Sequence, residues 1–514
     1  MLDVTLDRPL PEALPAGQAT AVFCIGTCFH QQRRVVDLAI TVDGVRSRPS
    51  AQRMPRLDRF RELHPNLAPA QVASAKLDPH SARDPEIRCF RSGFWAMIPL
   101  ACRERPGELE LRAEARLADG TVQSTTLATI VVVEPRARPS YNGYDGVRSA
   151  GEQPLIAICM ATYNPDIELF RIQVESLRAQ TDGDWLCFIS DDCSSPELFE
   201  AIAGVIAGDE RFVLSRSEEH LSFYRNFERA LEMVPAKVEL VALCDQDDRW
   251  YPDKLEALRA AIGSAELAYS DVRRLDADGN ARATSLWQGR RNNRANLASL
   301  LISNTIPGAA CLFRRRVIDH ALPFPAGPGW DFHDHWLALV AMVLGELAYV
   351  DRPLYDYVQH PGAVLGRVVT KPSSTAGRRG FRARLPKLRG FLDRWRSAYF
   401  SMYLERALLA EVLLARCERQ LTPRKRRALQ LVARAGDSPL AFVWLMARPT
   451  RALFGSNETL GVEQVLVRGI LWRFLISLRT WRRERPGRST DDASFPTFAP
   501  QHLGRRQRRW LAQQ

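Results

Sequence analysis

Apolar and polar residues alternate along the first part of the chain, and this pattern predicts β-strands. Residues 108–117 carry an apolar side chain at every second position: Leu109, Leu111, Ala113, Ala115 and Leu117. That two-residue period is typical of a half-buried strand. Asp43-Gly44 and Asp119-Gly120 indicate tight turns. Further strands are expected over 21–29, 35–42, 94–100 and 121–133, with no helical segment. The pattern predicts a β-sandwich accessory domain over residues 1–135.

The pattern changes after residues 136–153, which are rich in Pro, Gly, Ser and Arg and are interpreted as a linker. Short apolar runs then alternate with amphipathic stretches. Strands are expected over 155–160, 185–190, 211–214, 238–243 and 267–270, and helices over 167–179, 196–207, 223–234 and 252–262. This alternation is typical of a mostly parallel sheet covered on both faces. An α/β domain is therefore predicted over 154–370, with its ligands at the carboxyl ends of the strands.

Residues 371–514 form an arginine-rich region with helices expected over 398–420 and 462–481. The formal net charge of the whole chain is +12. Roughly +20 of charge lies in this region, so the rest of the chain is mildly acidic. A basic region on an acidic body suggests an anionic partner. We expect a membrane surface rather than nucleic acid, because no compact nucleic-acid recognition module is visible. A helical domain that binds a protein partner is the alternative.

The composition is globular, with 46% hydrophobic and 25% charged residues. Ten cysteines lie mostly within apolar runs, as buried free thiols do in a reducing compartment. Residues 1–14 lack the apolar core of a signal peptide, and no uncharged apolar stretch approaches the roughly 20 residues of a spanning helix. A cytoplasmic protein is expected, able to attach peripherally to the inner face of the cytoplasmic membrane.

Polar residues at the ends of the first two predicted α/β strands suggest how a nucleotide could bind. Residues 160–165, at the first end, contain no glycine, whereas a dinucleotide-binding turn needs Gly-x-Gly-x-x-Gly. A nicotinamide or flavin enzyme is therefore disfavoured, and so is a nucleotidyltransferase with a Gly- and Lys-rich loop. At the second end, Asp191 or Asp192 could accept the imide N–H of uracil or thymine. The alternative role is a helix N-cap.

Asp245, Asp247 and Asp248 follow a buried strand, three carboxylates within four residues. These groups repel one another, and a divalent cation that bridges carboxylate and phosphate oxygens would relieve the repulsion. A calcium-binding loop is excluded, because Arg249 and Trp250 occupy positions that need an oxygen ligand and a glycine. A solvated acidic turn is the remaining alternative.

Asp334 opens an apolar helix, where a carboxylate can cap the helix or act as a general base. The neighbouring His333 and His335 lack a third ligand at the spacing of a zinc site. His360 follows another predicted strand, and a lone histidine in such a place is more often structural than catalytic.

Together these short motifs resemble the family 2 glycosyltransferases of bacteria, in particular the rhamnosyltransferase-like branch. The matching motifs are Ala161-Thr162-Tyr163-Asn164, Ile189-Ser190-Asp191-Asp192, Arg225-Asn226-Phe227-Glu228, Asp245-Gln246-Asp247-Asp248-Arg249-Trp250, Pro252-Asp253-Lys254-Leu255, Tyr269-Ser270-Asp271-Val272, His333-Asp334-His335-Trp336 and Gln359-His360. They occur in the family's order and lie between residues 154 and 366, less than half of the chain.

The resemblance implies a GT-A fold and a role for each site residue. The nucleoside of a UDP- or dTDP-sugar would be held by the side chains of Thr162, Tyr163, Asn164 and Asp191 or Asp192. Asp245 would approach the ribose and Asp248 the donor, while Asp247, with Asp245, would bind Mg²⁺ or Mn²⁺ at the diphosphate. Asp334 would deprotonate the acceptor hydroxyl, and His360 would reach the metal or the diphosphate.

The sequence departs from the family pattern in two places. Residues 359–363 read Gln-His-Pro-Gly-Ala where the family often has Gln-His-Gly-Gly-Asn, which suggests an altered loop near the donor. Residues 304–310 differ from the usual Gly-Cys-Thr pattern in a region expected to face the acceptor.

The expected function is that of an inverting, metal-dependent glycosyltransferase in cell-surface polysaccharide synthesis. Its donor would be a nucleotide-diphospho-sugar and its acceptor a glycan or a lipid-linked glycan. The alternative is a non-catalytic protein that keeps the fold and binds a glycan or acts as a scaffold.

Overall fold

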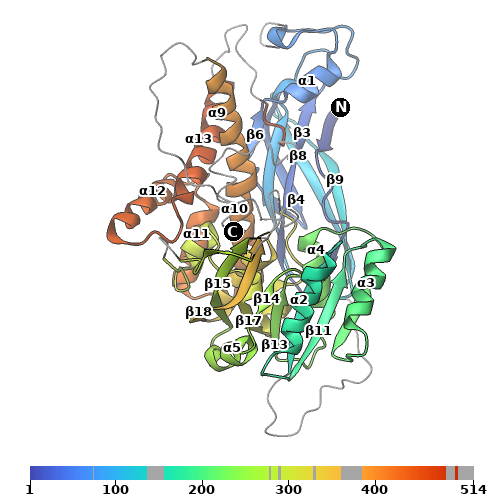
Figure 1. The fold of residues 1–514 in the computed structure, drawn as a ribbon. Coiled ribbons are helices and arrows are strands. Elements are labelled where there is room, and N and C mark those ends of the chain that lie inside the picture. The colour runs from blue at the N-terminus through green and yellow to red at the C-terminus, as the bar shows by residue number, and fades with distance from the viewer. Residues whose placement is uncertain are drawn as a thin grey trace.

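Figure 1 shows the computed structural model of the chain. It describes residues 1–72, 75–135, 155–276, 279–287, 291–327, 332–359, 385–481 and 492–495. The predicted linker over 136–153 and the predicted site residue His360 lie outside the described residues.

The N-terminal region is a sandwich of two β-sheets. One sheet has the order β1 (Leu2–Leu6), β3 (Thr20–His30), β7 (Gly93–Leu100) and β6 (Ala51–Met54). The other has the order β2 (Ala13–Pro15), β9 (Val122–Val133), β8 (Gly107–Leu117), β4 (Val35–Val42) and β5 (Val45–Ser47). The apolar positions of β8 are buried in the core between the sheets. The alternation of the sequence therefore identified the inner face correctly.

The expectation that this region contains no helix is wrong, because α1 spans Leu57–Leu63. Its seven residues make only two turns, too short a stretch for the apolar period of a helix to stand out. Phe60 anchors it in a small cluster with Phe29 and Phe90.

The α/β domain contains all the strands and helices expected between 155 and 270. Its sheet has the order β12 (Phe212–Arg216), β11 (Trp185–Asp191), β10 (Ile156–Thr162), β13 (Leu240–Cys244), β17 (Cys311–Arg314), β15 (Leu267–Asp276), β18 (Leu347–Gln359) and β14 (Arg249–Trp250), and β16 (Ala281–Ala283) pairs with β15. The described helices are α2 (Ile167–Arg178), α3 (Pro196–Ile206), α4 (Phe223–Glu232), α5 (Lys254–Ile262), α6 (Leu297–Ile302), α7 (Arg316–Ala321) and α8 (His333–Leu344), with a short 3₁₀ turn over Gly308–Ala310.

The sheet is mixed rather than mostly parallel. The strands from β12 to β13 are parallel, as are β15 and β18, but β17 runs antiparallel to both β13 and β15. Every residue of β17 but the last is buried. A buried apolar strand looks the same in a parallel and an antiparallel pair, so the sequence carried no signal of this reversal.

The C-terminal helices pack against the rest of the molecule. They are α9 (Leu385–Ala398), a π-helical turn over Tyr399–Tyr403, α10 (Leu404–Arg416), α11 (Pro423–Ala433), α12 (Pro439–Ala447), a 3₁₀ segment over Arg448–Phe454, and α13 (Val462–Trp481). In Figure 1, α9, α10 and α13 lie beside the sandwich, and α10 contacts β3 and β7. One continuous core joins these helices to the α/β domain and to the outer face of the β3–β7 sheet.

Two side chains show how closely the three regions are joined. Trp95 of β7 is fully buried, donates from Nε1 to the Tyr399 hydroxyl at 3.0 Å, and stacks near Trp472. Arg416 of α10 donates to the carbonyl oxygens of Ala321 and Pro323 at 2.9 Å each, and to Ala19 O at 3.4 Å. The sandwich therefore forms part of the wall against which the C-terminal helices fold.

Trp95→Ala is expected to lower the free energy of unfolding by about 3–5 kcal/mol, because it leaves a large cavity and an unpaired Tyr399 hydroxyl. Urea unfolding followed by far-UV circular dichroism would measure the change. Val122→Ala, at an exposed position of β9, is the matched control and should cost less than about 1 kcal/mol. An unchanged midpoint for Trp95→Ala would show that the sandwich and the helices are not energetically joined.

Candidate active site

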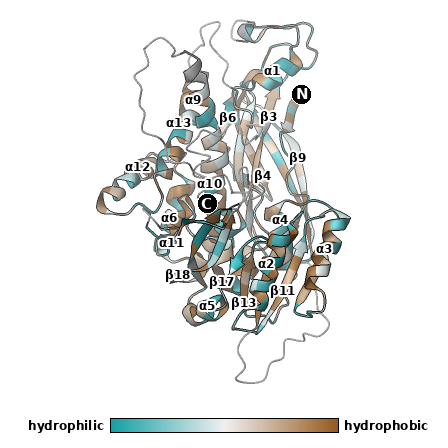
Figure 2. Cartoon of the chain, viewed as in Figure 1, coloured by the Kyte–Doolittle hydropathy of each residue, from teal (hydrophilic) through white to brown (hydrophobic). Residues whose placement is uncertain are grey.

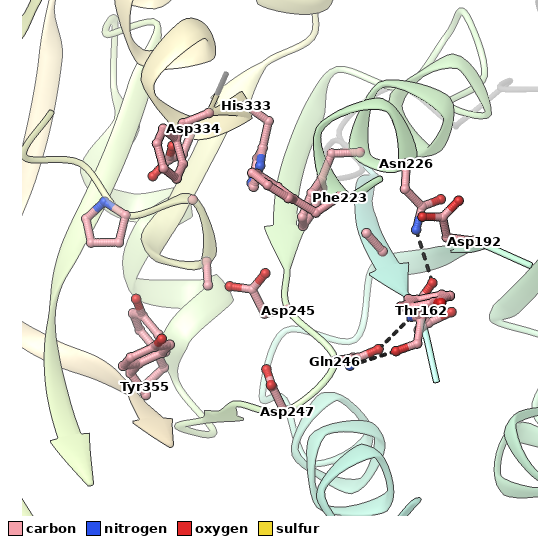
Figure 3. A pocket seen from close by; sticks show the side chains of 18 of the residues that line it. Thr162, Asp192, Phe223, Asn226, Asp245, Gln246, Asp247, His333, Asp334 and Tyr355 are labelled. Atoms are coloured by element: carbon pink, nitrogen blue, oxygen red, sulfur yellow. Dashed lines mark hydrogen bonds between the residues drawn. The ribbon is translucent and has the colours of Figure 1, made fainter. Parts of the chain in front are cut away.

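A cavity of about 450 Å³ opens at the carboxyl ends of β10 and β13. Its lining includes Thr162, Tyr163, Asp192, His220, Asn226, Asp245, Gln246, Asp247, Arg274, Gly308, His333, Asp334, Tyr355 and Tyr357. Figure 3 shows Asp245 and Asp247 near its centre, with Thr162 and Asp192 on one side and Asp334 and Tyr355 on the other. The cavity therefore lies where the alternation of strands and helices predicts a ligand.

Two amides hold the strand ends that form the floor of the cavity. The buried Asn226 of α4 donates from Nδ2 to the carbonyl oxygens of Thr162 at 3.1 Å and Ser190 at 2.9 Å. Gln246 accepts the backbone N–H of Tyr163 at 2.8 Å, which ties the loop after β13 to the loop after β10. These bonds fix the distance between the two loops that would hold the nucleotide.

An aromatic pair stands at the Thr162 side of the cavity. The rings of Tyr163 and His220 lie 4.3 Å apart at an interplanar angle of 31°. Asp192 orients His220 through a contact of 3.0 Å to Nδ1, and its two oxygens accept the backbone N–H groups of Leu221 and Ser222. Asp192 thus lines the cavity but is already engaged in holding the loop that carries His220.

Three residues predicted to bind the nucleotide sugar, Asn164, Asp191 and Asp248, do not line this cavity. Asn164 accepts the Ser195 backbone N–H at 3.0 Å and so joins two loops. Asp191 is fully buried and accepts from Ser194 and from the Thr162 hydroxyl. Asp248 is buried beneath the site. The helix N-cap considered as the alternative for Asp191 is wrong, because Ser195 caps α3 and Asp191 instead holds the turn before it through Ser194.

Asp245, Asp247 and Asp334 all line the cavity and influence one another electrostatically. Burial raises the pKa of the Asp245 carboxyl to about 7, and the charges of Asp247 and Asp334 add to this shift. Burial also raises the pKa of Asp248 well above its usual range, with further contributions from Asp245 and Asp247. The cavity is therefore a place where negative charge accumulates and a cation would be favourable.

One buried lysine provides part of the compensating charge. Lys254 of α5 is fully buried, with Nζ 3.3 Å from the centre of the Trp250 ring, and it donates to the carbonyl oxygen of Ala309. Burial lowers its pKa to about 7, although Asp248 and Asp245 act in the opposite direction. Lys254 is not among the residues that line the cavity, but its charge lowers the pKa of Asp245 and of Asp248.

Asp334 stands in the first turn of α8, on the opposite side of the cavity from Thr162. Burial raises its pKa to about 7, while the Asn304 side chain donates to Oδ2 at 3.0 Å and lowers the pKa. Gly308 allows the close approach of this region, because a Cβ there would lie 3.0 Å from His333 Nε2 and 3.2 Å from the Asp334 Cβ. Asp334 is held in place but retains the pKa of a usable base.

His333 forms part of the wall rather than a cationic centre. Its ring stacks on Phe227 with the centroids 3.7 Å apart, and burial lowers its pKa to about 3. It is therefore neutral at physiological pH. His335 points to the other side and contacts the carbonyl oxygen of Leu300 at 2.8 Å.

Four lining residues were missed from the sequence: His220, Gln246, Arg274 and Gly308. Asn304, which donates to Asp334, was missed as well. Gln246 could have been found, because it lies inside the acidic motif. Asn304 and Gly308 belong to the stretch noted as departing from the family pattern, and the structure places both against Asp334. His220 and Arg274 gave no signal, since each is a single polar residue in an otherwise ordinary segment.

The carboxylates fit a hard divalent cation. Asp245 and Asp247 bring oxygen ligands to the cavity, and both carboxylate oxygens of Asp248 are buried without a hydrogen bond of normal geometry to a described residue. Oxygen ligands from closely spaced carboxylates are the usual environment of Mg²⁺ and Mn²⁺.

Comparison with known proteins agrees with this geometry. Residues 157–322 match the family model described as Glycosyl transferase family 2. The chain is 27% identical over 253 residues to the uncharacterized protein y4gI of Sinorhizobium fredii, covering 48% of this chain and 27% of that protein. It is 26% identical over 133 residues to the uncharacterized glycosyltransferase MJ1057 of Methanocaldococcus jannaschii, covering 25% of this chain and 45% of that protein. The chain thus spans less than half the length of each relative.

Solved structures give weaker overlays. TarS of S. aureus, residues 1–349 in complex with UDP-GlcNAc, overlays with a TM-score of 0.38 at 13% identity, over 63% of this chain and 91% of that chain. The mannosyltransferase PcManGT of Pyrobaculum calidifontis, in complex with GDP-Man and Mn²⁺, overlays with a TM-score of 0.36 at 14% identity, over 66% and 91%.

The matched segment contains β10 to β13, the acidic loop and β17, which together make up the floor of the cavity. Residues 157–322 form a glycosyltransferase family 2 domain.

Proposed function

We propose that this protein transfers a sugar from a nucleotide-diphospho-sugar to a hydroxyl group of its acceptor, with inversion at the anomeric carbon. The observation that carries the proposal is the placement of Asp334 across one cavity from Asp245 and Asp247. A base and a cation-binding carboxylate pair on opposite sides suit a direct displacement.

The donor fits the cavity with its nucleoside toward Thr162. The exposed Tyr163 ring and His220 offer a stacking surface for a base, and uracil or thymine would suit it. The diphosphate would then lie at Asp245 and Asp247, with Arg274 on the wall as a further positive group. Mg²⁺ or Mn²⁺ bound there would neutralise charge on the departing nucleoside diphosphate. Contact of His360 with the metal or the diphosphate stays a prediction.

Asp334 supplies the chemical step. It takes the proton of the acceptor hydroxyl, the hydroxyl oxygen forms a bond to the anomeric carbon, and the bond from that carbon to the diphosphate oxygen breaks. Because the two oxygens lie on opposite faces of the carbon, one displacement inverts its configuration. A base with a pKa near the working pH is largely ionised and still basic enough to accept the proton.

The acceptor that we propose is a glycan or lipid-linked glycan in cell-surface polysaccharide synthesis, reached while the basic C-terminal region holds the protein at the cytoplasmic membrane. The relationship of this protein to the rhamnosyltransferase-like branch also stays a prediction. A non-catalytic scaffold that only binds a glycan is the alternative, and donor turnover distinguishes the two.

Slow hydrolysis of one UDP- or dTDP-sugar is expected in a panel that includes GDP-sugars, with Mn²⁺ or Mg²⁺ present. Asp247→Ala or EDTA should reduce it on the order of 10²-fold or more, because the diphosphate loses its neutralising partner. Asp253→Ala is the control, an exposed carboxylate of the same loop that pairs with Arg352. If the wild type neither hydrolyses nor binds any donor, the scaffold alternative is favoured.

Asp334→Asn should reduce transfer and hydrolysis on the order of 10²-fold or more and leave donor binding unchanged. The wild-type rate should rise with pH up to about 7 and then level off, because Asp334 acts only when ionised and burial raises its pKa to about 7. Asp319→Asn, at an exposed position of α7, should change the rate less than about twofold. A full rate for Asp334→Asn would assign the base to another residue.

Asp248→Asn should stabilise the metal-free protein by about 1 kcal/mol or more at pH 8. The unfolded chain loses this proton near pH 4, whereas the folded chain keeps it to higher pH, so the wild type loses stability as pH rises. The gain should shrink as pH falls toward 4. Thermal unfolding in EDTA would measure it, with Asp253→Asn as a control that shows little change. A destabilised Asp248→Asn protein would mean that the folded state needs this charge.

A further inference from the structure

An exposed apolar surface covers α12 and the 3₁₀ segment that follows it. We name it the C-terminal apolar patch, and it consists of Leu440, Val443, Met446, Leu453 and Phe454. Leu440, Leu453 and Phe454 are 83%, 82% and 84% exposed, respectively. Figure 1 shows α12 at a projecting edge of the molecule, and Figure 2 shows hydrophobic residues there. Large apolar side chains gathered at a surface mark an interaction site.

The sequence of α12 explains why the patch is apolar. The helix reads Pro-Leu-Ala-Phe-Val-Trp-Leu-Met-Ala, with no polar residue in nine. Ala441 and Leu445 pack inward, and Phe442 packs near Phe474 of α13 at 6.1 Å. Leu440, Val443 and Met446 follow at intervals of three and therefore share the outer face. A helix at the surface of a water-soluble region ordinarily presents polar residues on that face.

The surrounding charge is positive. Residues 421–481 contain ten basic and three acidic side chains. Two of the acids, Glu458 and Glu463, are buried and pair with Arg451 and Arg448. The third, Asp437, contacts Arg473 at 3.0 Å. Arg424, Arg427, Arg434 and Arg468 are exposed. The exposed charge on α11 to α13 is therefore positive and comes mainly from arginines.

We propose that the C-terminal apolar patch inserts into the interfacial layer of an anionic lipid bilayer, with the neighbouring arginines on lipid headgroups. Apolar insertion combined with basic residues is the usual basis of peripheral membrane attachment. No helix among the described residues combines the length and the apolar character of a membrane-spanning segment. A twofold dimer through the same patch would bring the arginines of both copies together, which like-charge repulsion opposes.

Hydrogen bonds connect the patch to Asp334, the proposed general base of the active site. Arg448 and Arg451 donate to the Ser299 hydroxyl of α6 at 2.6 and 2.9 Å. Two residues after α6 ends, Asn304 donates to the Asp334 carboxylate. The 3₁₀ segment of the patch is therefore joined through α6 to the residue that supports Asp334. If the protein has the proposed function, this connection favours an acceptor that is carried by a lipid.

Vesicle flotation of the full chain tests the proposal, using phosphatidylcholine vesicles with and without phosphatidylglycerol. The wild type should float with the anionic vesicles and bind less as salt rises. Leu440→Ser/Leu453→Ser/Phe454→Ser should weaken this binding at least about tenfold. Arg424→Gln/Arg427→Gln should weaken it about 25-fold, on the order of fivefold for each of the two charges. Val45→Ser/Val122→Ser, two residues of the sandwich that are 60% and 61% exposed, should bind as the wild type does.

Donor hydrolysis by the triple variant should equal that of the wild type, which shows that the variant is folded. Triple-variant binding equal to the wild type would overturn the proposal. So would a wild-type dimer in sedimentation velocity that the triple variant abolishes while neither protein binds vesicles, since the patch would then join two copies. Vesicle binding without donor turnover would contradict the proposed function and leave the lipid surface standing.

Discussion

Mutual repulsion among carboxylates at the ends of buried strands is the constraint around which this molecule is organised. Asp248 is buried beneath the site, and Asp245, Asp247 and Asp334 line the same cavity. Burying a carboxylate charge costs several kcal/mol unless an opposite charge or hydrogen bonds compensate for it. A buried lysine, Lys254, offsets part of this and is itself held at a pKa near 7. The remaining negative charge can be relieved by a ligand, which makes the destabilised site a binding site.

Such a site needs a rigid surround, because carboxylates that could move apart would lose their common ligand position. Asn226 and Gln246 fix the loops after β10 and β13, and Gly308 lets the segment before β17 press on His333. Behind them one hydrophobic core runs from the α/β sheet through α10 to Trp95 of the sandwich. The accessory regions thus contribute to the rigidity of the core behind the site.

Local pattern was sufficient to predict the strands and helices from 155 to 270 but not which side chains reach the cavity. These elements have strong periods, and several motifs at the strand ends lie at the cavity. Neighbours within a motif then diverge: Asp192 lines the cavity whereas Asp191 points into the interior, and Asp247 lines it whereas Asp248 is buried. These differences depend on the path of each loop. That path is determined by long-range hydrogen bonds, such as the one from Asn304 to Asp334. The packing of α10 on β3 could not be predicted either, because the apolar face of a helix does not indicate which element it packs against.

The C-terminal helices combine two surfaces that the sequence presented as one basic region. Arg416 is half-buried and Arg448 is buried, and both hold the C-terminal helices to the α/β domain, so part of the positive charge is structural. Only the arginines that stay exposed can attract an anionic surface, and they lie on the helices next to the apolar α12. Because the buried arginines anchor the segment after α12 to α6, whatever binds α12 is held at a fixed orientation to Asp334. An acceptor confined to the same surface would then approach the base from a restricted set of directions, which raises its effective concentration there without any further contact.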